Sequence, residues 1–211
     1  MLSKKEKLKE FHRSNIIDVA KKLFNEKGLT QTTMDDIAKE GEYSKTTLYA
    51  YFKSKDEIYL NIVCESMLLF KELLVNATTT NENLEIAFMA ICEAHVSLYN
   101  EYLPDYRGPI GSTSKLMTAS QQDELPPIYR EVFELGIEIH KVITDFLDER
   151  VKRKQVKSDI DTSQTAYVLQ SGLYGLIIMT NYQLPYADYM NVSRQEFLNY
   201  GFKMLLNAIK I

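Results

Sequence analysis

Polar side chains that could contact a nucleic acid are concentrated in one short segment of this chain. A helix predicted from Lys45 to Phe52 is too short and too polar to be explained by packing alone. Its outward positions are Lys45, Thr46, Thr47, Tyr49 and Tyr51. Hydroxyls, an ammonium and tyrosine rings can donate to phosphate oxygens or contact base edges and thymine methyls. The segment therefore predicts contact with double-stranded DNA.

The elements that position this segment begin at three helix N-caps. Thr33 with Asp36, and Ser54 with Glu57, match the capping-box pattern, and Ser44 is a further N-cap residue. Free backbone N–H groups at such helix starts suit phosphate. A helix after Thr33, a turn at Gly41-Glu42-Tyr43 and a second helix after Ser44 together predict a helix-turn-helix.

The rest of the chain predicts longer helices. A first helix is expected from about Lys4 to Lys27, with Gly28 as its C-terminal cap. The segment from Leu103 to Pro127 holds four of the five prolines and predicts broken structure, with one short helix near 114–120. A loop is expected at 183–191. No alternating pattern typical of strands occurs, so the predicted fold is all-α, with later helices at about 55–76, 82–101, 127–154, 162–182 and 193–210.

Composition indicates an ordinary globular protein. The 211 residues are 45% hydrophobic and 26% charged, which allows one or two domains without disulfides. Residues 1–60 hold 12 Lys/Arg against 10 Asp/Glu, whereas the remainder holds 13 against 19. A mildly basic head on an acidic body fits a chain whose head meets phosphate. The basic N-terminus is not followed by an apolar run and no stretch is long enough to span a membrane, so we expect a cytoplasmic protein.

Signatures of catalysis are missing from the sequence. It has no phosphate-binding glycine loop, no nucleophile elbow and no H-E-x-x-H helix. No pair of His, Cys, Asp or Glu has convincing zinc spacing, so neither a metal nor another cofactor is expected. An all-α enzyme or a helical adaptor, with the N-terminal helices as scaffold only, is the alternative. Retardation of duplex DNA distinguishes these classes.

The residues around the turn resemble a known family. Gly28, the run Thr32–Ala38 (TTMDDIA) and the run Tyr43–Ile58 (YSKTTLYAYFKSKDEI) are similar to the DNA-binding domain of the TetR family, over roughly residues 10–60. The chain departs from the family pattern at Glu42 and Thr46, because both positions commonly hold Gly.

The resemblance implies a role for each matching residue. Thr33, Tyr49, Tyr51 and Lys55 match positions that contact the DNA backbone. Ser44, Lys45, Thr46 and Thr47 match the start of the recognition helix, which enters the major groove. The resemblance also implies a two-domain, all-α regulator, most simply a repressor that a small-molecule effector releases from a pseudo-palindromic operator. Its DNA-binding domain would span 1–53, and a regulatory and dimerisation domain would span 54–211.

Two late helices carry glycine-containing apolar stripes that could form a homodimer interface. Each glycine within a helix costs about 1 kcal/mol relative to Ala, and the close approach of a partner helix would compensate. Packing within one chain is the alternative. The stripes consist of Val168, Gly172, Gly175, Leu176 and Met179, and of Phe197, Gly201, Met204, Leu205 and Ala208.

Aromatic and polar residues of the body could line an effector pocket. Such pockets have apolar walls with a few polar groups that fix the ligand. For each residue a plain core or surface position is the alternative, and His95 and His140 are ordinary core or surface histidines on that interpretation. The candidates are Tyr99, Tyr102, Phe133, His140, Tyr167, Gln170 and Tyr174.

Overall fold

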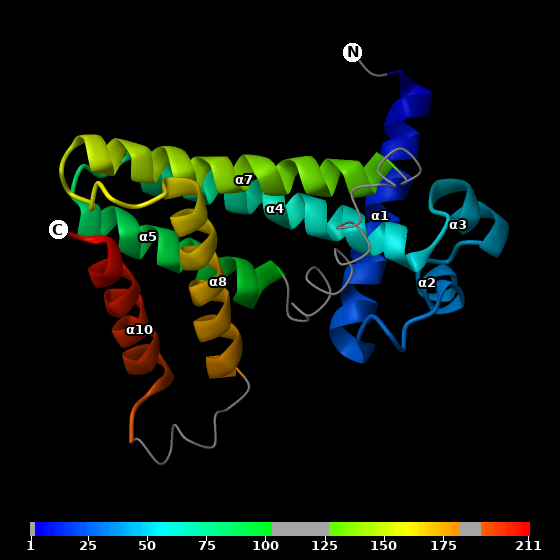
Figure 1. The fold of residues 1–211 in the computed structure, drawn as a ribbon. Coiled ribbons are helices and arrows are strands. Elements are labelled where there is room, and N and C mark those ends of the chain that lie inside the picture. Colours follow the sequence, from blue (N-terminus) through cyan, green and yellow to red (C-terminus); the bar gives the residue numbers. More distant parts are fainter. Residues whose placement is uncertain (1–2, 103–126, 182–190) are drawn as a thin grey trace. The chain divides into compact units, whose positions relative to one another are not determined.

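The regular structure of the chain is helical, as predicted (Figure 1). The computed structural model describes residues 3–102, 127–181 and 191–211. Extended backbone pairs in these ranges at a single bridge between Val156 and Lys210. The helices are α1 (Lys4–Lys27), α2 (Met34–Glu40), α3 (Lys45–Tyr51), α4 (Lys55–Thr79), α5 (Leu84–Ser97), the π-helix η1 (Leu98–Tyr102), α7 (Pro127–Lys152), α8 (Thr162–Asn181) and α10 (Arg194–Ile209).

Most helix ends lie within a few residues of the predicted ones. α3 ends at Tyr51, and Phe52 is its C-cap in an extended conformation. The helix predicted at 82–101 is α5 followed by one π-helical turn, which periodicity could not distinguish from a continuous helix. The short helix predicted near 114–120 and most of the loop at 183–191 lie outside the described residues.

The chain divides into two compact units. Of the described residues, one unit comprises 3–66 with 127–133, and the other comprises 67–102 with 134–181 and 191–211. Both α4 and α7 begin in the first unit and end in the second. The domain boundary predicted between residues 53 and 54 divides the chain by role, with DNA binding before it and regulation after it. That boundary stays a prediction.

The first unit packs α1, α2, α3 and the start of α4 around one apolar core. Ile16 and Ala20 of α1, Ile37 of α2, and Leu48 with Phe52 at the end of α3 are fully buried in this cluster. The predicted N-caps at Thr33 and Ser44 are present, and Thr33 forms a complete capping box with Asp36. The Ser54 hydroxyl likewise accepts a hydrogen bond from the Glu57 backbone. The caps and the core together fix where α2 and α3 begin.

The turn between α2 and α3 contains a strained residue. Glu42 has a φ of 57°, in the left-handed region that glycine adopts readily. This explains why the position commonly holds Gly in proteins that resemble this chain. The turn is nevertheless built, since Tyr43 donates its backbone N–H to the Ala38 carbonyl at 2.8 Å.

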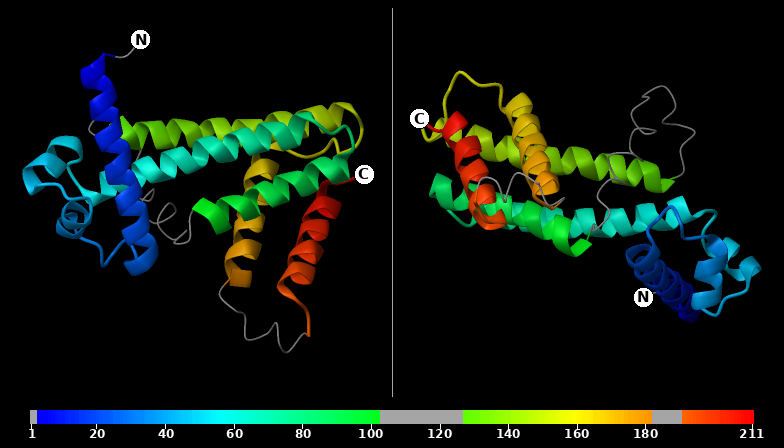
Figure 2. Two further views of the ribbon diagram at one scale, coloured as in Figure 1. Left: turned by 180° about the vertical axis from the view of Figure 1, so that it is seen from behind. Right: turned by 90° about the horizontal axis from the view of Figure 1, so that it is seen from below.

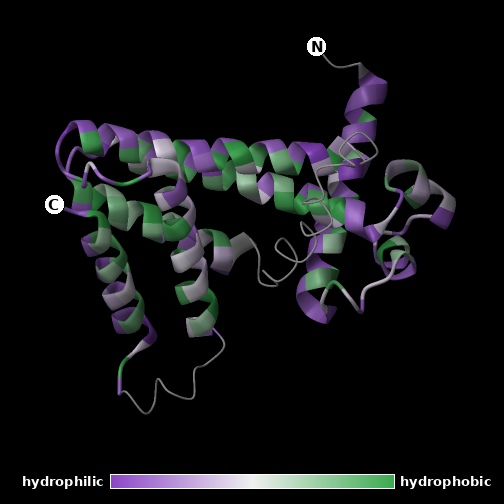
Figure 3. Ribbon diagram, viewed as in Figure 1, coloured by the Kyte–Doolittle hydropathy of each residue, from purple (hydrophilic) through white to green (hydrophobic). Residues whose placement is uncertain are grey.

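In the second unit, α8 and α10 lie side by side (Figures 1 and 2). Two glycines allow this approach: a Cβ at Gly201 would lie 2.6 Å from Cδ1 of Leu176, and one at Gly172 would lie 3.1 Å from Cδ2 of Leu205. Figure 3 shows the most apolar helix of the unit, α5, green along most of its length. Packing within the chain, the alternative left open by the sequence, therefore accounts for these two glycines.

The described residues give no sign of a membrane span or a metal centre. None of their helices combines the length and apolar character needed to cross a bilayer. They also contain no cluster of three or more His, Cys, Asp or Glu side chains arranged to hold a metal ion.

Candidate nucleic-acid interface

The first turn of α3 presents short polar side chains to solvent. Lys45, Thr46 and Thr47 are all exposed. The Ser44 hydroxyl caps the helix by accepting a hydrogen bond from the Thr47 backbone at 3.1 Å, and it lies 2.8 Å from the Thr47 hydroxyl. Thr46 takes no part in this cap, so its hydroxyl and methyl are the groups of this turn most available to a ligand.

The opposite face of α3 is anchored by groups from α1. The Arg13 guanidinium lies 4.3 Å from the centre of the Phe52 ring and donates to Asn61 Oδ1 at 2.7 Å. The Tyr43 hydroxyl lies 3.0 Å from both His12 Nδ1 and Asn15 Nδ2. These contacts hold both ends of α3. Local sequence patterns do not predict them, because the two partners of each hydrogen bond are 28 or more residues apart in the chain.

An exposed ion pair links the two helices of the motif. The Lys45 ammonium donates to Asp35 Oδ2 at 2.6 Å. This hydrogen bond raises the pKa of Lys45. Because exposed pairs contribute little to stability and exchange readily with solvent, the ammonium can leave Asp35 for a phosphate.

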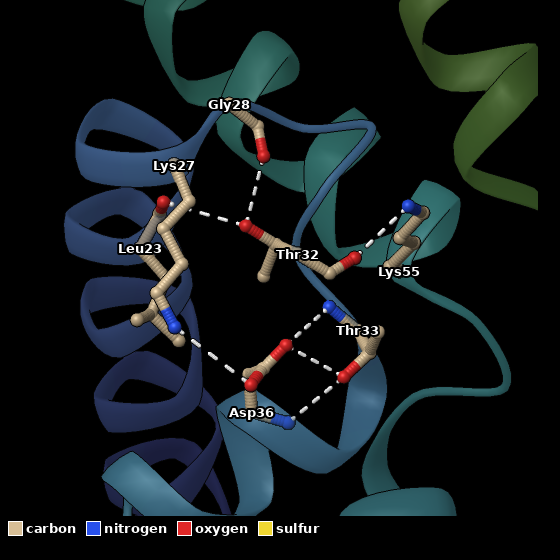
Figure 4. A network of polar contacts seen from close by, with 7 residues as sticks. All are labelled: Leu23, Lys27, Gly28, Thr32, Thr33, Asp36 and Lys55. Carbon is tan, nitrogen blue, oxygen red and sulfur yellow. Dashed lines mark hydrogen bonds and ion pairs between the residues drawn. The ribbon is translucent and has the colours of Figure 1, made fainter.

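The loop before α2 is held by a network of polar contacts (Figure 4). The buried Thr32 hydroxyl donates to the Gly28 carbonyl at 2.8 Å, which closes the end of α1. The Thr33 hydroxyl donates to Asp36 Oδ2 at 2.7 Å and accepts from the Asp36 backbone. The hydroxyl and backbone N–H of Thr33 hold the pKa of the Asp36 carboxyl below its usual value. The start of α2 is thus fixed before any ligand arrives.

The Lys55 ammonium belongs to the same network. It donates to the backbone carbonyls of Leu29, Thr30 and Thr32, at 2.8, 3.2 and 2.9 Å. An ammonium has three N–H donors, so all of them have partners within the chain. No local pattern indicates this role, which ties the first turn of α4 to the loop before α2. Contact of Lys55 with a phosphate stays a prediction.

The two predicted tyrosines differ in their surroundings. Tyr49 is 51% exposed, so its hydroxyl can reach a ligand without rearrangement. Tyr51 is half-buried, with its ring centre 6.0 Å from that of His12. The geometry leaves both as candidates for phosphate contact, with Tyr49 the more accessible.

The predicted effector residues are only partly gathered together. His140 Nδ1 accepts from Gln170 Nε2 at 3.2 Å, and the Tyr167 ring centre lies 6.5 Å from that of His140. Tyr167 is 65% exposed, so it lies on the surface. Tyr174 contacts His95, with ring centres 5.6 Å apart.

The other three effector candidates are less informative. Tyr99 is half-buried, and Phe133 is an exposed residue of the first unit. The Tyr102 side chain lies outside the described residues. None of these positions is tested as a ligand contact, so all seven stay predictions.

The predicted dimer stripes separate into an inner and an outer part. Gly201 is buried, and Gly172, Leu176, Leu205 and Phe197 are half-buried. Val168, Gly175, Met179, Met204 and Ala208 are exposed. A Cβ at Gly175 would meet no atom within 4 Å, so packing within the chain does not explain this glycine.

Comparison with known proteins identifies the helix-turn-helix. The family of bacterial regulatory proteins called tetR matches residues 16–62, which hold the second half of α1, all of α2 and α3, and the start of α4. The chain is 30% identical over 148 residues to the biofilm operon icaADBC HTH-type negative transcriptional regulator IcaR of Staphylococcus aureus (strain Newman). That match covers 70% of this chain and 75% of the relative. The chain belongs to the TetR family.

The TetR-family assignment is consistent with two further matches. The fatty acid metabolism regulator protein of Bacillus subtilis (strain 168) is 25% identical over 175 residues, which cover 79% of this chain and 88% of the relative. The ketosteroid transcriptional regulator KstR2 of Mycobacterium tuberculosis shares the fold, with a TM-score of 0.69 at 16% identity and coverage of 94% and 95%. The protein is a DNA-binding transcriptional regulator of a non-enzymatic family.

Proposed function

We propose that this TetR-family regulator is a dimeric repressor that a small molecule releases from a pseudo-palindromic operator. The observation that supports the proposal most strongly is the exposed first turn of α3, capped by Ser44 and anchored from behind by Arg13. A rigid, solvent-facing recognition helix is what readout in a major groove requires. The relative IcaR is named a negative regulator, which favours repression here.

The proposed DNA contacts divide into two classes. Phosphate contacts come from Thr33 at the start of α2, from Tyr49 and Tyr51 on α3, and from Lys55 to the extent that its ammonium leaves the loop. Base contacts come from the first turn of α3, where Lys45, Thr46 and Thr47 stand beside Ser44. Phosphate contacts set affinity and register, whereas contacts with base edges distinguish sequences.

The proposed dimer uses the outer faces of α8 and α10. Four large side chains of these faces are exposed in a single chain: Val168 (63%), Met179 (50%), Tyr200 (67%) and Met204 (58%). A face with several large exposed apolar side chains is typical of an interaction surface. A second copy of the same face, related by a two-fold axis, would cover it and place two recognition helices about 34–36 Å apart.

The proposed release works through α4, the helix that begins beside α3 in the chain and continues into the second unit. Its first turn is tied to the loop before α2 by Lys55. An effector that binds better to one arrangement of the second unit would shift the population of dimers toward a spacing that no longer matches the operator. The affinity ratio of the effector for the two arrangements sets the extent of release.

The experiment is a selection of duplex sequences by the purified full-length chain, followed by retardation of the selected duplex at several salt concentrations. A repressor of this kind retains its duplex at nanomolar concentration, and its affinity falls steeply as salt rises. A small-molecule extract of the source cells should then release the duplex. If no duplex is enriched over random sequence, the proposal fails.

A further inference from the structure

A small cavity lies inside the second unit, among α5, α7 and α8. Its volume is about 10 Å³, close to the space that one water molecule requires. Aromatic and aliphatic side chains, among them Phe88, Phe146 and Leu173, form most of the wall. The polar residues of the lining are His95 from α5 and Gln170 from α8.

His95 faces this cavity with an acceptor rather than a donor. Its side chain is 1% exposed, and Nδ1 lies 2.8 Å from the Ile91 carbonyl oxygen. A carbonyl can only accept, so the proton of the ring is on Nδ1. Burial lowers the pKa of His95 to about 4, which keeps the ring neutral. Nε2 is therefore an unprotonated nitrogen with a lone pair.

Nε2 of His95 has no hydrogen-bond partner within the described residues. The ring is held edge-on by Phe70 and Tyr174, with centre-to-centre distances of 4.8 and 5.6 Å. Gln170, the other polar residue of the wall, uses its amide N–H groups on His140 Nδ1 and on the Ala166 carbonyl. It therefore has no amide donor left for Nε2.

A buried acceptor without a partner destabilises a fold, and a phenyl ring at this position would have none of that cost. An unpartnered acceptor in an apolar wall is a departure from good core packing. Such departures are typical of functional sites. A single water could satisfy Nε2, but it would find few other polar partners in this wall. A ligand hydroxyl could replace such a water and keep its hydrogen bond.

We infer that this cavity is the effector site, and that its effector is an apolar molecule carrying a neutral hydrogen-bond donor that binds Nε2 of His95. The inference rests on the proposed function, since it assigns the effector class of that repressor. Phenols and alcohols on a hydrocarbon skeleton fit this chemistry. A carboxylate does not, because its oxygens would face the lone pair of Nε2.

The small size of the cavity connects binding to regulation. A molecule larger than water does not fit this volume, so its binding requires that the lining side chains or the helices that carry them move. The free energy of binding is then coupled to a rearrangement of the second unit, which is the requirement for an effector. His140 reinforces the wall from outside, since its Nε2 lies 3.0 Å from the Ser163 hydroxyl while its Nδ1 holds Gln170.

The test compares two ligands of nearly equal shape, 1-naphthol and 1-methylnaphthalene, by calorimetric titration of the full-length protein. The wild type should bind the naphthol about tenfold more tightly, a difference of about 1.4 kcal/mol that one buried hydrogen bond supplies. His95→Phe, which keeps a ring of similar size, should remove this preference. His12→Phe, which changes a histidine of the first unit in the same way, is the matched control and should keep it. Failure of 1-naphthol to bind the wild type, or a preference unchanged in His95→Phe, overturns the inference.

A second measurement does not depend on a ligand. The imidazole ¹⁵N spectrum of the wild type should show His95 protonated on Nδ1, with Nε2 as the bare nitrogen, and 1-naphthol should shift the Nε2 signal. A proton on Nε2 contradicts the inference. Retention of the selected duplex is scored separately without a probe. If the duplex is retained but naphthol does not bind, the proposed repressor function stands and the proposed effector site is wrong. If naphthol binds but no duplex is retained, the cavity binds such ligands and the proposed repressor function is wrong.

Discussion

Substitution of Lys55 distinguishes two roles of its ammonium, the tie to the loop before α2 and contact with a DNA phosphate. Substitution by Met keeps the length of the side chain and removes the ammonium that donates to three carbonyls of the loop before α2. A hydrogen bond to a charged group contributes about 1.5–3 kcal/mol. Because the freed carbonyls regain water at a half-buried site, we expect a total loss of about 2 kcal/mol rather than three full contributions. That is a large share of the roughly 5–15 kcal/mol that stabilise a typical domain.

Urea unfolding of Lys55→Met and of the wild type measures this loss, with Lys53→Met as the control for an exposed lysine of the same segment. DNA affinity of the same variants is then measured over a range of salt. If Lys55 acts through the loop, affinity falls for all sequences but the slope of log K against log[salt] stays the same. Unchanged stability with a slope reduced by about 0.9 would rule out action through the loop, because that pattern identifies a lost phosphate contact.

Three further predictions concern specificity, assembly and pH. Thr46→Gly should keep non-specific binding and weaken discrimination at one base pair of each half-site by about 1 kcal/mol, and binding to single-base operator variants measures this; a uniform loss for all sequences would remove Thr46 from base readout. Gly175→Glu should give monomers of unchanged helix content in sedimentation, because its Cβ meets no atom of its own chain; dimers as stable as the wild type would contradict the interface. Between pH 7 and pH 5 the wild type should lose about 2 kcal/mol of unfolding free energy through His95, whose pKa of about 4 in the fold lies below its unfolded value. The unfolded chain binds a proton that the buried native ring does not bind, so the free energy of unfolding decreases as the pH is lowered. Denaturant titrations at each pH should show a flatter profile for His95→Phe.

The sequence predicted the features that depend on local patterns. The N-caps at Thr33 and Ser44, and the capping box with Asp36, follow from side chains that reach only three residues along the chain. The helices of the body follow from apolar periodicity, and the helix-turn-helix follows from both.

What the sequence could not predict depends on residues that meet only in the fold. The ties from Arg13 to Asn61 and from Lys55 to the carbonyl of Leu29 join positions far apart in the chain. Gly201 and Gly175 look alike in a helical pattern, yet one packs against Leu176 and the other faces open space. The sequence pattern does not distinguish His95 from an ordinary histidine, because the bond of Nδ1 to Ile91 and the bare Nε2 are visible only in three dimensions.

In the proposed repressor, the two recognition helices of one dimer read two half-sites of one operator together. The most direct test inserts about 5 bp, half a helical turn, between the half-sites of the selected duplex and measures the affinity of the wild-type protein. We expect affinity to fall to the level of non-specific DNA, because one recognition helix would then face the wrong side of the duplex. An affinity unchanged by the insertion would contradict it, since each helix-turn-helix would then bind by itself.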